Sequence, residues 1–266
     1  MPALGMGTWR MGERRANRAR EIAALRLGID LGMALIDTAE MYADGGAEEL
    51  VGEAIAGRRK DVFLVSKIYP HHASNRGAFA ACRRSLERLA TDSLDLYLLH
   101  WRGEIPLAET IAGFEALRKE GSIRAWGVSN FDRSDMEELL RLPGGEHCAA
   151  NQLLYNVACR GPEWDLLPLC RRHGIAVMAY SPLDEGRLVG NRRLRRLAER
   201  AHMTPARLAL AWLLAQKQVA VIPKASDPAH VHDNHTALES SLSRATLAEI
   251  DDAFLPPAGP SPLKMI

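Results

Sequence analysis

Cysteine is scarce in this sequence, with only four among 266 residues. Cys82, Cys148, Cys159 and Cys170 form no Cys-x-x-Cys pair and are too few for the disulfide framework of a small secreted protein. No window approaches the roughly 20 consecutive apolar residues of a membrane span, and the first residues lack the basic and apolar pattern of an export signal. We therefore expect a cytoplasmic protein that does not enter a membrane.

An excess of charge is also missing, because 34 Lys and Arg residues face 33 Asp and Glu residues, for a net charge of +1. Such a balance does not draw a protein onto nucleic acid or an anionic membrane, so we expect a small-molecule partner. We also expect a monomer or weak oligomer. The one concentration of charge lies in residues 190–202 and consists of Arg192, Arg193, Arg195, Arg196 and Arg200. We interpret it as the exposed face of an extra helix, with a phosphate or nucleic-acid patch as the alternative.

Short apolar runs alternate with longer segments of helical period. Runs of this kind are typical of strands buried on both faces. They occupy residues 4–8, 35–36, 62–65, 94–99, 123–128, 149–153, 175–179 and 219–222. The helical segments between them place apolar residues three and four apart and begin near Asn17, Ala47, Ser74, Pro106, Asp132, Pro162, Thr204 and Pro228.

Eight strand and helix units predict an α/β fold, a (β/α)8 TIM barrel, formed by residues 1–266 as a single domain. Thr204-Pro205 has the pattern of a helix start, and Gly32, Gly121 and Gly174 stand where helices should end. The extra helix lies between the seventh strand and the seventh helix, and a short tail follows Leu255. No Gly-x-Gly-x-x-Gly motif argues for a doubly wound sheet instead.

Residues that transfer protons follow three successive predicted strands. Asp37, Lys67 and His100 stand at the ends of strands two, three and four, and Tyr42 lies just beyond Asp37. Since the carboxyl ends of barrel strands meet at one rim, these side chains should converge. Each has an ordinary structural explanation on its own: a helix cap, a solvent-facing lysine or a core histidine. Their joint occurrence favours a catalytic site.

The four residue types suit carbonyl chemistry. A free phenol has a pKa of about 10, and a neighbouring ammonium at Lys67 should lower the pKa of Tyr42. Asp37 can hold Lys67 charged, while His100 can hydrogen-bond a carbonyl oxygen. Because the set contains a proton donor but no source of hydride, a reduction would require a cofactor.

A series of motifs in fixed order resembles the aldo-keto reductase family from about residue 4 to residue 250. They are GMGTW at 5–9, LIDTAEMY at 35–42, VSK at 65–67, LLHW at 98–101, GVSN at 127–130, NQ at 151–152, AYSPL at 179–183 and IPK at 222–224. Residues 39–48 and the ending at 263–266 are most similar to the bacterial methylglyoxal-reductase-type branch.

The resemblance implies reduction of small aldehydes or ketones, such as methylglyoxal-like dicarbonyls and aromatic aldehydes, with NADPH preferred and NADH weaker. It makes Tyr42 the proton donor, with Lys67 and Asp37 tuning it and His100 orienting the carbonyl. It places the cofactor on Ser129, Asn130, Gln152, Tyr180, Ser181, Leu183, Lys224, Ala225, Ser226, His230, Asp233 and Asn234. Trp9, Met41 and Trp101 match positions that line the substrate pocket.

Departures from the family pattern refine these expectations. The family commonly has an arginine where this chain has His230, so we expect a smaller preference for NADPH. A metal site at His230, His232, Asp233 and His235 is the weaker alternative, because their spacing matches no known metal motif, and we expect no metal. The hairpin that usually closes the bottom of the barrel is expected to be missing or shortened.

Overall fold

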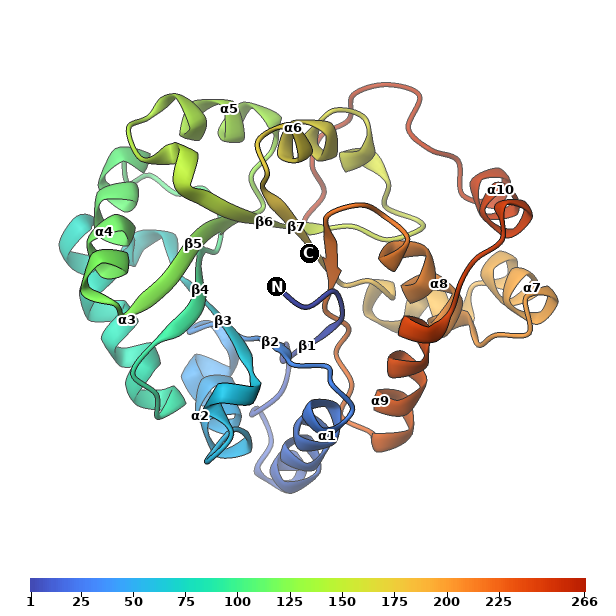
Figure 1. Cartoon of the computed structure of the whole chain (residues 1–266), viewed down its shortest axis with the longest axis horizontal. Coiled ribbons are helices and arrows are strands. Elements are labelled where there is room, and N and C mark those ends of the chain that lie inside the picture. Colours follow the sequence, from blue (N-terminus) through green and yellow to red (C-terminus); the bar gives the residue numbers. More distant parts are fainter.

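The structure is a computed structural model that describes residues 1–266, and it shows a ring of strands surrounded by helices (Figure 1). The eight strands are β1 (Gly5–Gly7), β2 (Leu35–Asp37), β3 (Phe63–Ile68), β4 (Leu94–Leu99), β5 (Ile123–Ser129), β6 (Cys148–Leu154), β7 (Ala176–Tyr180) and β8 (Val219–Val221). They pair in parallel in the order in which they follow one another in the chain. The predicted (β/α)8 barrel is confirmed.

The ring closes between its first and last strands. The backbone N–H of Val221 donates to the carbonyl of Ala3 at 2.8 Å, and the N–H of Gly7 donates to the carbonyl of Pro223 at 3.0 Å. These bonds satisfy backbone groups that would otherwise form two open edges. Closure brings the carboxyl ends of all eight strands to one face of the molecule.

The helices between the strands begin and end close to where the sequence indicates. They are α1 (Arg18–Asp30), α2 (Gly46–Ala54), α3 (Asn75–Leu89), α4 (Leu107–Glu120), α5 (Arg133–Arg141), α6 (Leu166–Arg172), α7 (Arg192–Arg200), α8 (Pro205–Leu214), α9 (Pro228–His235) and α10 (Arg244–Ala253). Ser74, Asp132 and Thr204 each cap a helix by accepting a hydrogen bond from a backbone N–H three residues later. Gly121 ends α4 in the left-handed conformation, which favours glycine.

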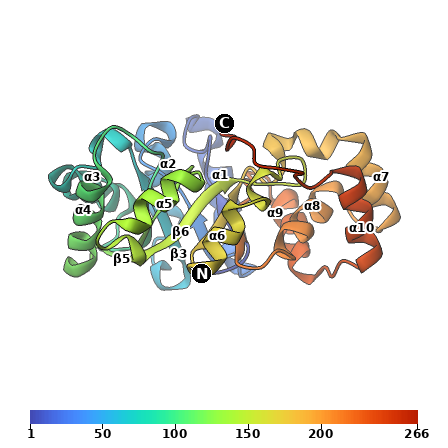
Figure 2. The same ribbon diagram turned by 90° about the horizontal axis from the view of Figure 1, so that it is seen from above.

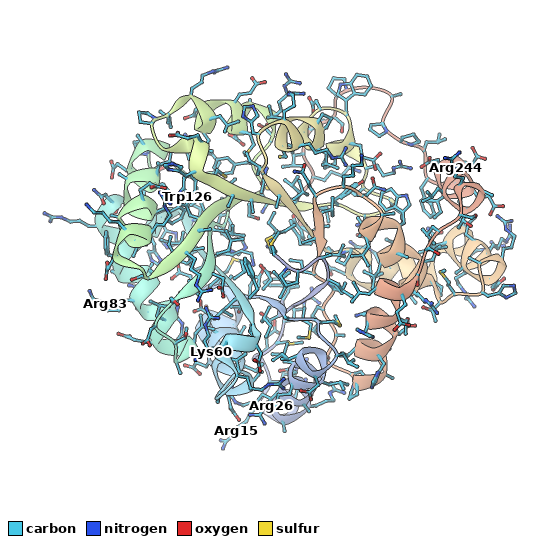
Figure 3. The ribbon with its side chains drawn as sticks, in the orientation of Figure 1. Arg15, Arg26, Lys60, Arg83, Trp126 and Arg244 are labelled. Carbon is cyan, nitrogen blue, oxygen red and sulfur yellow. The ribbon has the colours of Figure 1, made fainter.

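Two apolar layers make up the core. The inner layer fills the barrel and consists of Leu35, Val65, Leu96, Leu98, Ala150, Met178, Ala220 and Ile222. The outer layer lies between the barrel and the helices, where Trp126 of β5 packs against Phe114 of α4 (Figure 3). Because these apolar side chains fill the barrel, the polar residues at the strand ends lie above a packed apolar core.

The extra helix and the chain that follows the barrel pack together. α7 buries Leu194, Leu197 and Ala198 and leaves its arginines exposed, which confirms the predicted extra helix. It lies beside α10 at one side of the barrel, and Arg200 of α7 pairs with Glu249 of α10 at 2.7 Å (Figures 1 and 2). α10 was not predicted from the sequence.

Arg160, in the segment after β6, ties this region to the barrel. It donates to both carboxylate oxygens of Glu163, to Asp251 and to the carbonyl of Phe254, all within 2.8 Å, and its guanidinium lies 5.0 Å from the ring centre of Trp212. Its side chain is only 9% exposed. Arg160 thus fixes the end of α10, from which the chain runs to the face that carries the strand ends (Figure 2).

No helix of this chain combines the length and the apolar character that crossing a bilayer requires. The charged side chains labelled in Figure 3 are all exposed on the outer surface: Arg15, Arg26, Lys60, Arg83 and Arg244.

Candidate active site

A cavity of about 710 Å³ opens at the carboxyl ends of the strands. It brings together fifteen of the nineteen residues predicted to form the site. These are Trp9, Asp37, Met41, Tyr42, His100, Ser129, Asn130, Gln152, Tyr180, Ser181, Leu183, Lys224, His230, Asp233 and Asn234. The other four, Lys67, Trp101, Ala225 and Ser226, do not line it.

Lys67 lies behind Tyr42 and connects it to Asp37. Its ammonium lies 2.7 Å from Asp37 Oδ2, 3.1 Å from the Tyr42 hydroxyl and 2.8 Å from the carbonyl of Thr38, and the side chain has no solvent exposure. A buried ammonium is stable only with partners of this kind. Residues at the ends of β2 and β3 therefore build one hydrogen-bonded series, which reaches the cavity at the Tyr42 hydroxyl.

Burial and neighbouring charges shift the pKa values of Lys67 and Tyr42 in opposite directions. Burial lowers the pKa of Lys67, but Asp37 and Tyr42 together outweigh it, and the net shift is upward. Lys67 is therefore charged at neutral pH. For Tyr42, burial raises the pKa more than the Lys67 ammonium lowers it, and the Asp37 carboxylate raises it further.

The expected lowering of the Tyr42 pKa is wrong for the free protein. The sequence identified the ammonium but not the desolvation, since Tyr42 is 8% exposed and packs edge-on against Trp9. With its pKa raised, the phenol holds its proton at neutral pH, as a proton donor must.

His100 stands beside Tyr42, with ring centres 5.8 Å apart. Burial, reinforced by the Lys67 charge, lowers its pKa well below the usual 6.5, so the imidazole is neutral at neutral pH. Its Nδ1 is buried and has no hydrogen-bond partner in the protein. A neutral imidazole carries one N–H, which leaves His100 able to donate to an oxygen in the cavity.

The turn that carries Tyr42 rests on a buried ion pair. Residues Ala43 and Asp44 have left-handed backbone angles, and Gly45 follows with φ of +92°. A Cβ at Gly45 would lie 2.6 Å from the Arg88 side chain, whose Nε donates to the fully buried Glu48 at 2.6 Å. Glycine is thus required where the Tyr42 turn crosses Arg88.

Polar side chains from β5, β6 and β7 form the wall next to this chain. Gln152 Nε2 donates to Asp37 Oδ1 at 2.7 Å, and the Tyr180 hydroxyl donates to Asn130 Oδ1 at 2.9 Å. Asn130 holds φ of +60°, a conformation that asparagine tolerates better than most residues. Ser129 Oγ donates to the backbone carbonyl of Gln152 at 3.1 Å.

The far end of the cavity is basic and lies between β8 and α9. Lys224 and the exposed His230 line it, together with Asp233 and Asn234. Ser226 does not line the cavity, but its Oγ lies 3.3 Å from the Lys224 ammonium. Asp233 accepts a hydrogen bond from the Thr204 hydroxyl at 2.8 Å. No three His, Cys, Asp or Glu side chains of the chain lie close enough together to hold a metal ion.

The apolar side chains near Tyr42 fit the predicted substrate positions only in part. Trp9 and Met41 line the cavity, whereas Trp101 packs against His100 and Tyr69 outside it. Arg10 was not among the predicted residues; its guanidinium lies 3.5 Å from the Glu185 carboxylate, and both residues line the cavity. Arg10 directly follows Trp9 after a strand end, which was the available signal.

Comparisons with known proteins agree with this geometry. The model of the "Aldo/keto reductase family" matches residues 3–254. Methylglyoxal reductase YeaE of Escherichia coli is 52% identical, covering 100% of this chain and 95% of that protein. Glyoxal reductase of Bacillus subtilis is 34% identical over 94% of this chain and 88% of that protein.

A solved structure of very similar shape also exists. It is the aldo/keto reductase of Klebsiella pneumoniae in complex with NADP and acetate, with a TM-score of 0.98 and 51% identity, covering 100% of this chain and 96% of that one. The family match, the relatives and the shared barrel lead to one conclusion: the chain is an oxidoreductase that belongs to the aldo/keto reductase family.

Proposed function

We propose that this protein uses NADPH to reduce small aldehydes and ketones to alcohols, with methylglyoxal-like dicarbonyls and aromatic aldehydes as substrates. The observation that carries the proposal is the Asp37, Lys67 and Tyr42 chain, which opens into the cavity beside a neutral His100. The Escherichia coli relative is a methylglyoxal reductase and the Bacillus subtilis relative a glyoxal reductase, which supports the substrate class.

The cavity fits NADP(H) at both ends. Lys224 supplies an ammonium for a phosphate and His230 lines the cavity nearby, while Ser129, Asn130 and Gln152 present polar atoms close to Tyr42. Tyr180 offers a half-buried ring between these ends, with Ser181 and Leu183 next to it. Ser226 Oγ, 3.3 Å from the Lys224 ammonium, would help to position it, and Ala225 joins the two residues in the chain. When bound, NADPH supplies the hydride that the chain itself lacks.

Tyr42 is the proposed proton donor. As negative charge develops on a carbonyl oxygen, the protonated Tyr42 hydroxyl gives its proton to that oxygen, and the Lys67 ammonium at 3.1 Å stabilises the resulting phenolate. Asp37 keeps Lys67 charged and in place. The N–H of neutral His100 donates to the same oxygen, which orients the carbonyl for the transfer.

Substrate size follows from the walls around Tyr42. Trp9 and Met41 are the apolar side chains next to the hydroxyl, and Trp101 stabilises the orientation of His100 from outside the cavity. Because the loop between His100 and Pro106 is short, it adds no further wall. We therefore propose small carbonyls as good substrates and steroid ketones as poor ones.

The test is to mix the protein with NADPH and a panel of carbonyls while following the loss of reduced-nicotinamide absorbance. We expect turnover with methylglyoxal and with aromatic aldehydes, and little with steroid ketones. No turnover with any aldehyde would contradict the proposed activity, and better turnover of steroids would contradict the proposed substrate class.

A further inference from the structure

One buried carboxylate, that of Glu48 in α2, connects to both ends of the hydrogen bond between Lys67 and Tyr42. Lys67 belongs to β3, and the residue before it, Ser66, points to the opposite face of the strand, as successive strand residues do. Ser66 Oγ donates to Glu48 Oε1 at 2.5 Å, and both side chains are fully buried. Glu48 is thus anchored to the strand that carries Lys67.

The second oxygen of the same carboxylate holds the turn that follows Tyr42. Glu48 Oε2 lies 2.6 Å from both Nε and Nη2 of Arg88, whose side chain lies against Gly45. Ala43 and Asp44 in this turn have left-handed backbone angles. Since residues other than glycine keep such angles only where the surrounding structure imposes them, the turn depends on the contact with Arg88.

The chain before Tyr42 is held by backbone groups instead. The N–H of Glu40 donates to the carbonyl of Lys67 at 3.2 Å, and the N–H of Tyr42 donates to the carbonyl of Ala39 at 3.1 Å. These bonds do not require particular side chains. Of the two anchors of Tyr42, the one through Glu48 is therefore the one that a substitution can remove.

We propose that Glu48 is a positioning residue for the proton transfer: by joining Ser66 to Arg88 it holds the Tyr42 hydroxyl 3.1 Å from the Lys67 ammonium. This inference rests on the proposed function in taking Tyr42 as the proton donor. Glu48 does not line the cavity, so its effect on the reaction passes through Tyr42. Without the Glu48 charge, the partly exposed Arg88 side chain is free to turn to solvent and release the turn.

The first test measures reduction of methylglyoxal by Glu48→Gln, which keeps the shape of the side chain but has no charge to hold Arg88. We expect kcat to fall roughly ten- to hundredfold, because a displacement of a reacting group by about 1 Å has a cost of that order. The KM for methylglyoxal and the dissociation constant for NADPH should stay within about twofold, because Glu48 does not line the cavity. A folded Glu48→Gln protein that keeps more than half of the wild-type kcat overturns the inference.

Glu53→Gln is the matched control. Glu53 lies on the same helix and also pairs with an arginine, Arg18, at 2.9 Å, but this pair is on the surface and far from the Tyr42 turn in its contacts. The control should therefore leave kcat within about twofold of the wild type.

The same substitution in a Tyr42→Phe protein separates positioning from general damage. If Glu48 acts through the Tyr42 hydroxyl, Glu48→Gln should cause no further loss of rate once that hydroxyl is absent. Single-turnover reduction with excess enzyme measures these low rates. A further loss of about tenfold in this background overturns the inference, because Glu48 then supports the barrel in general.

Ser66→Ala covers the case in which Glu48→Gln does not fold. It leaves the pair between Glu48 and Arg88 intact and removes only the link to β3, and circular dichroism checks that the barrel forms. We expect kcat to fall about three- to tenfold, again without further loss in the Tyr42→Phe background. A folded Ser66→Ala protein with unchanged kcat contradicts the proposed role of Glu48.

A last measurement does not depend on turnover. Because the chain has only five tyrosines, the Cζ resonances of a tyrosine-labelled protein are few, and that of Tyr42 is the one missing in Tyr42→Phe. Glu48→Gln and Ser66→Ala should move it toward its position in Lys67→Met, which lacks the ammonium, and Glu53→Gln should leave it in place. An unmoved resonance in both variants overturns the inference, whatever the protein reduces. A moved resonance in a protein that reduces no carbonyl overturns the proposed function alone.

Discussion

At the scale of single residues, the Tyr42 hydroxyl is the atom on which the proposed chemistry depends. We expect Tyr42→Phe to reduce the rate of carbonyl reduction by about 10²–10⁴-fold, because a positioned acid is lost where charge develops. The change removes no contact at Ser129, Asn130, Gln152 or Lys224, so the dissociation constant for NADPH should stay within about twofold.

Steady-state reduction of methylglyoxal, run beside a fluorescence titration with NADPH, measures both quantities. A Tyr42→Phe protein that retains more than about a tenth of the turnover would show that another group delivers the proton.

The pH dependence of the rate follows from the two shifted groups. Reduction requires a protonated Tyr42, whose pKa is raised from 10.0, so the rate should decline only as the pH rises above about that value. His100 must be neutral, and its pKa lies well below 6.5, so the rate should stay level as the pH falls through 6.5. The profile of kcat between pH 5 and pH 10 checks this, and a drop centred near 6.5 would place an ordinary histidine in the mechanism.

Lys224 is the lysine at the far end of the cavity. We expect Lys224→Ala to weaken NADPH binding tenfold or more while changing NADH binding little, because a charged hydrogen bond to a phosphate contributes roughly 1.5–3 kcal/mol. Dissociation constants for both cofactors give the answer. Equal losses of NADPH and NADH binding would mean that Lys224 does not contact the additional phosphate of NADPH. If this end of the cavity binds that phosphate, His230→Arg should increase the preference for NADPH over NADH.

At the scale of elements, Arg160 joins the segment after β6 to α10. Arg160→Ala removes four hydrogen bonds and the contact with Trp212. We expect a loss of about 2–3 kcal/mol, which lowers the melting temperature by roughly 4–12 °C. Thermal unfolding followed by circular dichroism measures it.

Arg187→Ala is the matched control, because Arg187 pairs with Asp184 on the surface, where solvent screens the pair and it contributes little to stability. If both variants melt at the same temperature, Arg160 does not hold α10 in place.

Most elements could be predicted from sequence because buried parallel strands leave unbroken apolar runs, and β4 begins and ends at the expected residues, Leu94 and Leu99. α10 could not be predicted, since Ile250 is its only fully buried residue and its apolar pattern is correspondingly weak. The turn after Tyr42 could not be predicted from the sequence pattern either. Its left-handed backbone angles depend on the contact between Gly45 and Arg88, which are 43 residues apart in the sequence.

The site shows the same division. Residues that follow strand ends, such as Lys67 and His100, could be placed by topology alone. Contacts that depend on side-chain direction could not: Trp101 turns away from the cavity, while Arg10 turns into it. The direction of the Tyr42 pKa shift could not be predicted from the sequence either, because desolvation depends on how tightly neighbouring groups pack around the phenol.

At the scale of the whole molecule, we predict that residues 1–266 unfold as one domain. The strands form one continuous ring, and 60 buried residues form a single outer core that runs from Leu4 to Ile250. Far-ultraviolet circular dichroism and tryptophan fluorescence should therefore report the same midpoint in urea. Two separated transitions would show that part of the barrel unfolds independently.

The complete enclosure of Lys67 has a consequence for the durability of the protein. An aldehyde modifies a lysine by forming an imine, which requires an accessible nitrogen with a free electron pair. Lys67 is fully buried behind Tyr42 and holds its proton, so it offers neither. The burial that tunes the proton donor thus protects the lysine from chemical damage by the reactive dicarbonyls that we propose as substrates. The exposed Arg10, the one arginine that lines the cavity, has no such protection.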